Sequence, residues 1–375
     1  RSPKADTKQE DEECDDERDL ARVFPIRSRW PMQELFCRSR VVKEIVDNLL
    51  YVLQKHSSKS FLPVLQPAIG VGNAFEGWSP SYEDNTVYQL LVPLEPPRGH
   101  IFQLEMVTIS KMLPKAFRVR VELELICTRE NMLYMAHHPQ KEPRRRKPWP
   151  SLLNTILCTG SYLDVLKIAL WFQKLVRSTW MEVPQACFYE MKMLHSSRSC
   201  MLKLKDAWGE KFRVEMIFGV QRGNSDIFLC SQISEAIPTL STIWSESYAV
   251  AEGKFFKHMA RQVPRGNFHL KCLHLCIHKL ACPLLSAHVV KTAVMHLLTT
   301  IPVAGWCGKE LVLRMQDTMK YLQSCLEKKR LNHFFFGNEK MPKEIILPPA
   351  FQGAKPNNLF QHLELYPAAR CEAMR

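Results

Sequence analysis

Residues 69–94, IGVGNAFEGWSPSYEDNTVYQLLVPL, are the most informative part of this sequence. A glycine-rich turn at Gly70, Gly72 and Asn73 leads through a polar loop into an apolar strand. Such a turn lets backbone amides approach a phosphate, and two carboxylates one residue apart on the next strand would face one Mg²⁺ ion. The two strand positions are Val87 and Gln89, and neither is a strong Mg²⁺ ligand. The segment therefore predicts the scaffold of a phosphate and metal site without its metal chemistry.

Charge is unevenly distributed along the chain. Residues 1–20 hold nine Asp/Glu and four Lys/Arg, a net charge of −5. Because the whole chain has a net charge of +13, the other residues together carry +18. The acidic segment has little to bury and is predicted to be disordered. The basic remainder favours anionic partners such as nucleic acid, phosphorylated headgroups or an acidic protein surface. At 375 residues and 46% hydrophobic content, the length suggests two domains.

Cysteine content indicates the redox compartment of the protein, and hydropathy indicates whether the chain contains a membrane-spanning helix. Thirteen cysteines, an odd number, lack the regular spacing of a disulfide-rich secreted domain. They favour a reducing, cytosol-like environment. No window reaches the roughly 18 consecutive apolar residues that a spanning helix needs. Because the sequence begins at Arg1, we expect it to be a fragment, with any membrane anchor upstream of it.

The hydrophobic pattern divides the chain into a mixed region and a helical region. Apolar residues at three- and four-residue spacing predict helices at Pro31–Gln54, Gly160–Trp180, Leu270–Leu280, Ser286–Thr300, Lys309–Lys329 and Asn357–Leu365. Alternating or apolar runs predict strands at Val87–Leu94, His100–Met106, Arg118–Cys127, Cys200–Lys205, Phe212–Val220 and Asp226–Ser231. The expected fold class is α+β, followed by an all-helical lobe from about Val263.

Several blocks of this sequence resemble one known family. They are FEGW (75–78), LLVPLEPPRG (90–99), CTGSYLDV (158–165), FGVQRG (218–223), HLKCLHLC (269–276), SAHVVKTAVMHLLTTIP (286–302), YLQSCLEKKRLNHFFFGN (321–338) and NLFQHL (358–363). Over residues 31–370 they look like the inositol 1,4,5-trisphosphate receptor-interacting protein-like family, its like 1 type in particular. That family belongs to the male-abnormal-21 domain group, which shares the bilobal nucleotidyltransferase fold of cyclic GMP–AMP synthase.

The resemblance implies a division of the chain and a set of site positions. It implies an acidic linker at 1–30, a nucleotidyltransferase-like α+β lobe at 31–262 and a helical lobe at 263–375. Active relatives use a Gly-Ser turn and three metal-binding acids. These fall on Gly72 and Asn73, and on Val87, Gln89 and Glu215, so one acid of three is present and Asn73 replaces the serine. The synthase's zinc-binding insertion has no counterpart that we can place.

From this we predict a non-catalytic protein without cofactor or bound metal. The resemblance implies that it is membrane-associated through a segment outside this chain, single-pass, and binds a receptor or channel such as the inositol trisphosphate receptor. One alternative is an active nucleotidyltransferase with relocated acids, for which Glu83, Asp84, Glu105 and Glu124 are the nearby carboxylates. Another is a module that senses nucleic acid or another anion through its basic body.

Two further patterns carry alternatives of their own. The cationic run Arg144, Arg145, Arg146 and Lys147 suits an anion or partner contact, or a solvated loop between prolines. His269, Cys272 and Cys276 share one predicted helix face and resemble a zinc ligand set. Zinc usually takes its ligands from two separate elements, so a buried core helix explains the same pattern with fewer assumptions.

Overall fold

A computed structural model describes residues 32–57, 62–78, 86–107, 116–123, 152–232, 240–263, 266–280 and 285–361. They form two compact units. The sheet unit comprises the described residues within Ser39–Val71 and Val87–Val250. The helical unit comprises the described residues up to Arg38, those within Gly72–Thr86 and those from Ala251 on. The predicted α+β class is confirmed, with strands in one unit and helices alone in the C-terminal region of the other.

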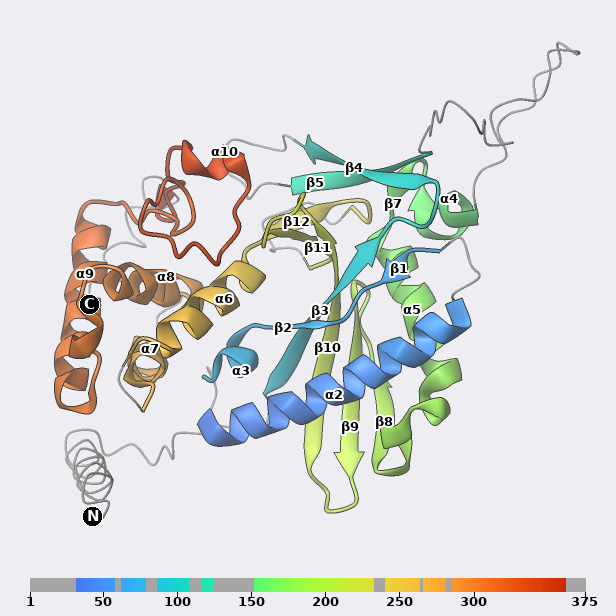
Figure 1. Cartoon of the computed structure of the whole chain (residues 1–375), viewed down its shortest axis with the longest axis horizontal. Helices are drawn as coiled ribbons and strands as arrows, with labels where there is room; N and C mark the ends of the chain where they lie inside the picture. Colours follow the sequence, from blue (N-terminus) through green and yellow to red (C-terminus); the bar gives the residue numbers. More distant parts are fainter. Residues whose placement is uncertain are drawn as a thin grey trace, which may run out of the picture. The chain divides into compact units, whose positions relative to one another are not determined.

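The strands of the sheet unit form one mixed sheet (Figure 1). In the described residues they are β1 (Val64–Leu65), β2 (Ile69–Val71), β3 (Val87–Glu95), β4 (His100–Val107), β5 (Ala116–Leu123), β6 (Cys158–Thr159), β7 (Tyr162–Leu163), β8 (Tyr189–Leu194), β9 (Ser199–Asp206), β10 (Lys211–Gln221), β11 (Phe228–Cys230) and β12 (Trp244–Ser247). Their main order is β1-β3-β10-β11-β12-β5-β7-β6, and β2, β4, β8 and β9 pair from the side. All six predicted strands are present, although the end of the one at Arg118–Cys127 lies outside the described residues.

The centre of this sheet is a parallel pair, β3 and β10, while the other pairs are antiparallel. From Val214 to Val220 every residue of β10 is buried. A strand that is covered on both faces needs a continuous apolar run rather than alternation, which is why its sequence VEMIFGV is so apolar. Glu215 is the ionisable residue within that run. The sheet thus fixes Glu215 in a mostly apolar surrounding.

The helices of the sheet unit are short except for two. They are α2 (Met32–Ser57, whose first residues to Arg38 count with the helical unit), α4 (Leu152–Leu157), α5 (Val165–Thr179), and the 3₁₀ turns η1 (Trp180–Glu182) and η2 (Pro184–Cys187). The side chain of Asp164 caps α5, accepting from the backbone N–H of Leu166 at 2.9 Å and of Lys167 at 3.2 Å. The predicted helix start at Gly160 is therefore wrong, because Gly160 adopts a φ of 63° in the turn between β6 and β7.

The helical unit contains helices joined by turns. They are α3 (Asn73–Glu76), α6 (Ala249–Ala260, beginning in the sheet unit), α7 (Phe268–Lys279), α8 (Ala287–Leu298), α9 (Leu311–Glu327), α10 (Pro349–Gln352), and the 3₁₀ turns η3 (Val303–Gly305) and η4 (Gly308–Glu310). Three predicted helices correspond to α7, α8 and α9. The helix predicted at Asn357–Leu365 is wrong as far as residue 361, because Asn358 instead forms a β-bridge with Asn332. No helix in the described part of the chain is both long and apolar enough to cross a bilayer.

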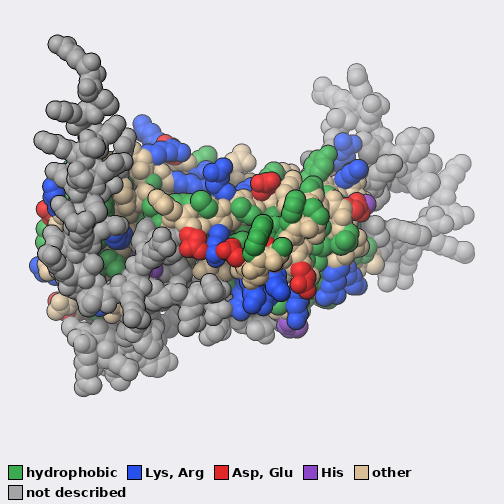
Figure 2. All heavy atoms as spheres, turned by 90° about the horizontal axis from the view of Figure 1, so that it is seen from below, with side chains coloured by type: hydrophobic (Ala, Val, Ile, Leu, Met, Phe, Trp, Pro, Cys, Tyr) green, Lys and Arg blue, Asp and Glu red, His purple; other side chains and the backbone are tan. Residues whose placement is uncertain are grey.

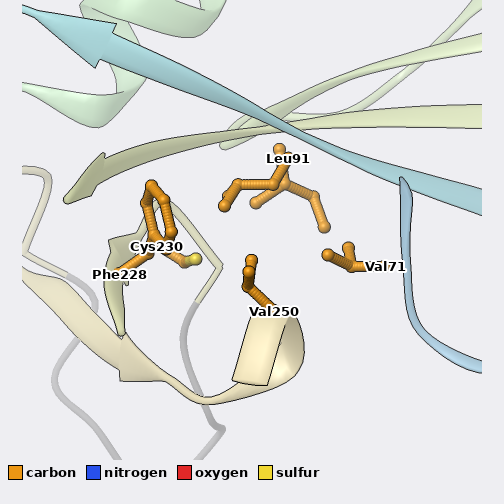
Figure 3. Packing of buried hydrophobic residues seen from close by; sticks show 6 residues of the cluster. Val71, Leu91, Phe228, Cys230 and Val250 are labelled. Atoms are coloured by element: carbon orange, nitrogen blue, oxygen red, sulfur yellow. The ribbon is translucent and has the colours of Figure 1, made fainter. Parts of the chain in front are cut away.

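One apolar cluster shows how the sheet unit is packed on the face that carries Gln89 and Glu215. Val71, Leu91, Ile217, Phe228, Cys230 and Val250 form it, drawn from four strands and the start of α6 (Figure 3). The cluster closes this face toward the later residues of β3 and β10. Lys and Arg side chains gather in several clusters in the view of Figure 2, where Asp and Glu are fewer. On the face seen in this view, positive charge is therefore in excess, in the same sense as the composition of the chain.

Candidate functional site

The parallel register of β3 and β10 brings two of the predicted site residues together. Gln89 lies directly opposite Glu215. The Gln89 side-chain amide donates from Nε2 to Oε2 of Glu215 at 3.1 Å, and the Ser199 hydroxyl donates to Oε1 at 2.8 Å. Glu215 is 8% exposed, so both carboxylate oxygens find donors within the protein rather than in bulk water.

The hydrogen bond between Gln89 and Glu215 differs in charge from a pair of carboxylates at the same positions. A carboxylate pair at positions 89 and 215 would place two negative charges side by side and would need a cation between them. The amide of Gln89 is neutral and donates a hydrogen bond, so it satisfies Glu215 without an ion. The described residues contain no group of three His, Cys, Asp or Glu side chains placed to hold a metal. This arrangement is a closed polar contact.

Position 87, where active relatives carry a metal-binding acid, has a cation beside it. Val87 lies directly opposite Arg213 on β10, and Arg213 in turn lies opposite Lys203 on β9. Residues that are directly opposite share one face of a sheet, so Val87, Arg213 and Lys203 form a row on the face that also carries Gln89 and Glu215. Where an active site would present carboxylates to Mg²⁺, this row presents an aliphatic side chain and two cations.

The turn at Gly72 and Asn73 belongs to the helical unit, whereas Val87, Gln89 and Glu215 belong to the sheet unit. Gly72 has φ 75° and ψ −173°, a backbone conformation that favours glycine. It precedes the one-turn helix α3, in which the N–H of Glu76 donates to the Gly72 carbonyl at 3.1 Å. Gly77 then ends α3 in the left-handed region with φ 87°. Gly72 is the N-cap of α3, so this short helix has no side-chain capping hydrogen bond at its start.

The helical unit contains a buried ionic cluster that the sequence patterns did not reveal. Lys291 on α8 donates from Nζ to Oε1 of Glu76 at 2.6 Å and to Oε2 of Glu252 at 2.5 Å. The exposed fractions are 5% for Lys291, 5% for Glu76 and 8% for Glu252. The indole Nε1 of Trp78 donates to the second oxygen of Glu76 at 2.9 Å. FEGW thus supplies both an acid and its hydrogen-bond donor, although Glu76 has no periodicity that would single it out.

Electrostatics explain how this cluster keeps its charges while buried. Burial alone would lower the pKa of Lys291, but the carboxylates of Glu252 and Glu76 outweigh burial and raise it. Burial likewise opposes ionisation of Glu252, yet Lys291 and His288 lower its pKa. The ring of Phe256, whose centroid lies 5.5 Å from Lys291 Nζ, adds a cation–π contact. The ammonium of Lys291 therefore stays charged beside the carboxylate of Glu252, whose pKa is lowered.

The other predicted site residues have different outcomes. The carboxylate of Glu105 pairs with Arg120 at 2.8 Å and accepts from the Tyr162 hydroxyl at 2.9 Å. Glu105 is therefore already engaged and is a poor candidate for a relocated metal ligand. Four cations predicted to contact an anion, Arg144, Arg145, Arg146 and Lys147, lie outside the described residues, as do Glu83, Asp84 and Glu124.

The helix face with His269, Cys272 and Cys276 forms as predicted, on α7, and all three side chains are buried. The Cys272 thiol lies 4.0 Å from the Cys276 sulfur and 4.0 Å from the Thr318 hydroxyl. The ring of His269 stacks on Phe256, and neither of its nitrogens has a hydrogen-bond partner in the described residues. Burial lowers the pKa of His269 to about 4, so the ring is neutral. The face packs as a core surface.

Sequence comparisons agree with this fold. Residues 269–345 match the domain family described as Mab-21 protein HhH/H2TH-like domain. The chain is 33% identical over 356 residues to inositol 1,4,5-trisphosphate receptor-interacting protein-like 1 of Mus musculus, which covers 92% of this chain and 64% of that protein. It is 28% identical over 342 residues to inositol 1,4,5-trisphosphate receptor-interacting protein of Homo sapiens, covering 84% of this chain and 62% of that protein.

The chain thus spans just under two thirds of the length of the relatives that it matches. A similar protein in Rattus norvegicus is also 33% identical, over 358 residues, with the same two coverages as the mouse protein. The likeness runs through both the sheet unit and the helical unit, since it covers 92% of the chain. Together with the Mab-21 match in the helical region, this likeness makes the chain similar to the inositol 1,4,5-trisphosphate receptor-interacting protein-like proteins over most of its length.

Proposed function

We propose that this protein is a non-catalytic member of the nucleotidyltransferase fold that acts by binding another protein. The observation that carries the proposal is the hydrogen bond from Gln89 to Glu215, with Val87 at the position of the other acid. Two-metal phosphoryl transfer depends on carboxylates to fix both ions and to neutralise developing charge. A neutral amide that donates to the remaining acid serves neither purpose.

We further propose that the partner is a receptor or channel, with the inositol trisphosphate receptor as the first candidate. The support is the names of the relatives, which describe them as interacting with that receptor. We also propose that a single membrane-spanning segment outside these 375 residues holds the protein at a membrane. About a third of each relative lies beyond the matched region, which leaves room for such a segment.

Turnover assays test the first part. The purified chain is incubated with ATP and GTP, with Mg²⁺ or Mn²⁺, and products are separated by chromatography. The expected result is no product beyond that of Glu215→Ala, a variant that removes the remaining acid. Metal-dependent product that disappears in Glu215→Ala would instead establish an active transferase with relocated acids.

The partner is tested separately. Full-length protein carrying a proximity-labelling tag is expressed in cells, and labelled membrane proteins are identified on each side of the bilayer. Direct binding to purified inositol trisphosphate receptor is then measured. We expect saturable binding of the receptor. Labelling confined to soluble proteins, together with no direct binding, would contradict both the membrane and the receptor proposals.

A further inference from the structure

One face of strands β8, β9 and β10 carries five cations. In the antiparallel registers Lys192 lies opposite Lys203, Lys203 opposite Arg213, and Lys205 opposite Lys211. Two rows therefore share one face, Lys192–Lys203–Arg213 and, two residues along, Lys205–Lys211. We call these five residues the basic face. Lys192, Lys205 and Lys211 are exposed, whereas Lys203 and Arg213 are half-buried.

These registers are unfavourable for the isolated protein. Like charges directly opposite each other on antiparallel strands destabilise a sheet. The basic face contains three such pairs, and the opposing acid in these rows is Glu190, opposite Lys205. Among the described residues no carboxylate forms an ion pair with any of the five cations. Natural sequences tend to break a local rule without internal compensation where a site serves a function.

The position of the basic face shows which ligand chemistry fits. Its first row ends at Val87, and Gln89 and Glu215 follow on the same face. In an active relative a metal ion would bridge the strand carboxylates and a phosphate. Here the carboxylate of Glu215 is occupied by Ser199 and Gln89, and cations take the neighbouring positions. We propose that the basic face binds a soluble ligand carrying two or more neighbouring phosphates, directly and without a metal ion.

The dimensions of the basic face favour a small ligand over a membrane or a nucleic-acid duplex. Neighbouring strands lie about 4.8 Å apart, so the row of three cations spans only about 10 Å. Lys203 and Arg213, in the middle of the face, are half-buried. A phosphate chain can reach such side chains more readily than a flat bilayer can. The guanidinium of Arg213 suits bidentate phosphate binding. The adjacent positions Leu194 and Met201 are aliphatic and offer no ring on which a base would stack.

Phosphate binding at the basic face is separate from the proposed binding of a protein partner and does not depend on it. Binding of inorganic tripolyphosphate to the whole chain is measured by calorimetry in EDTA, at low and at physiological salt. We expect saturable binding that weakens as salt rises. The double variant Lys203→Glu/Arg213→Glu should lower the affinity by about tenfold or more, because two charge-assisted contacts are lost. Added Mg²⁺ should not strengthen binding.

A matched control separates the basic face from the net charge of the protein. Lys174 and Arg177 are exposed on α5 of the same unit. The variant Lys174→Glu/Arg177→Glu changes the charge by the same amount and should keep the affinity of the parent protein within about twofold, since long-range effects are screened. The neutral variant Lys203→Gln/Arg213→Gln should also lose binding. Thermal unfolding of each variant checks that it is folded.

Other outcomes overturn the proposal. No tripolyphosphate binding in EDTA, equal loss in the α5 control, or binding that requires Mg²⁺ would each do so. Binding to vesicles containing phosphoinositides, or to duplex DNA, without binding of soluble tripolyphosphate would assign the face to a different class of partner. Turnover of a nucleotide with Mg²⁺ would contradict the non-catalytic function but leave the basic face standing, so the two proposals can fail separately.

Discussion

In the helical unit Lys291 is 5% exposed and contacts two carboxylates, whereas in the sheet unit Lys203 lies half-buried between two other cations. The first arrangement satisfies the requirement that a buried charge be paired. The second would be unstable if it were buried, and near the surface it is tolerated. A fully paired buried charge therefore contributes to stability, whereas charges without a counterion in the protein indicate a ligand or partner outside the chain.

Removing the charge of Lys291 should have the largest effect on the free energy of unfolding. Lys291→Met leaves the carboxylates of Glu76 and Glu252 buried without their cation, so we expect a loss of about 3–5 kcal/mol in the free energy of unfolding. The matched substitution Lys203→Met removes a repelling charge and should change stability by less than about 0.5 kcal/mol. Urea unfolding followed by circular dichroism measures both. Equal losses at the two positions would end the contrast.

The helical unit should also respond to acid through a buried group that is kept neutral. Burial lowers the pKa of His269 to about 4 in the folded protein, against about 6.5 when unfolded. Below pH 6.5 the unfolded chain binds a proton that the folded chain does not. Stability should therefore be full above that pH and fall by about 3 kcal/mol as the pH drops to 4. The difference between the parent protein and His269→Leu, measured by urea unfolding at each pH, isolates this contribution; a constant difference would contradict it.

The contact between Gln89 and Glu215 should have an effect on stability between those of Lys291 and Lys203. Gln89→Leu removes the donor to one carboxylate oxygen and leaves Ser199 on the other, so we expect a loss of about 1–3 kcal/mol. Gln103 on β4 is exposed and serves as the control, since Gln103→Leu should fall within about 0.5 kcal/mol of the parent. Thermal unfolding compares them. If the two variants lost the same amount, the carboxylate would not depend on the amide.

The smallest expected effect has the opposite sign. Lys203→Glu converts two like-charge pairs, with Lys192 and Arg213, into opposite-charge pairs. We expect a gain of about 0.2–1 kcal/mol that diminishes as salt rises. The gain would accompany the loss of phosphate binding, which is the relation expected when a protein keeps an unfavourable feature for function. Urea unfolding at two salt concentrations decides it, and a loss of stability would show that the cations do not repel one another.

The fold was largely predictable because its signals are local. Apolar spacing locates α2, α8 and α9, and alternation locates β4 and β5. Gly160 shows the limit: its neighbours are apolar enough for a helix, but Asp164, which caps α5, determines where that helix begins. Two-residue strands such as β6 and β7 have too few residues to show a period. Their pairing depends on partners that are distant in sequence.

The sequence predicted which residue types occupy the site but not which side chains contact one another. The absence of carboxylates at positions 87 and 89 can be read directly from the sequence. That Ser199 would reach Glu215, or that Arg213 would stand beside Val87, depends on the register of three strands. The cluster of Glu76, Glu252 and Lys291 brings together residues up to 215 positions apart. No spacing rule connects such residues, because tertiary packing alone makes them neighbours.

The route of the polypeptide through its two units has a practical consequence for dissecting the protein. Because Gly72–Thr86 belongs with the segment from Ala251 on, neither unit is continuous in sequence. A fragment that begins at residue 251 would retain Lys291 and Glu252 but would lack Glu76 and Trp78, and so would lose one of the two carboxylates that pair with Lys291. Expression of either half by simple truncation should therefore give poorly folded material, whereas supplying residues 72–86 through a circularly permuted or fused design would restore the missing carboxylate.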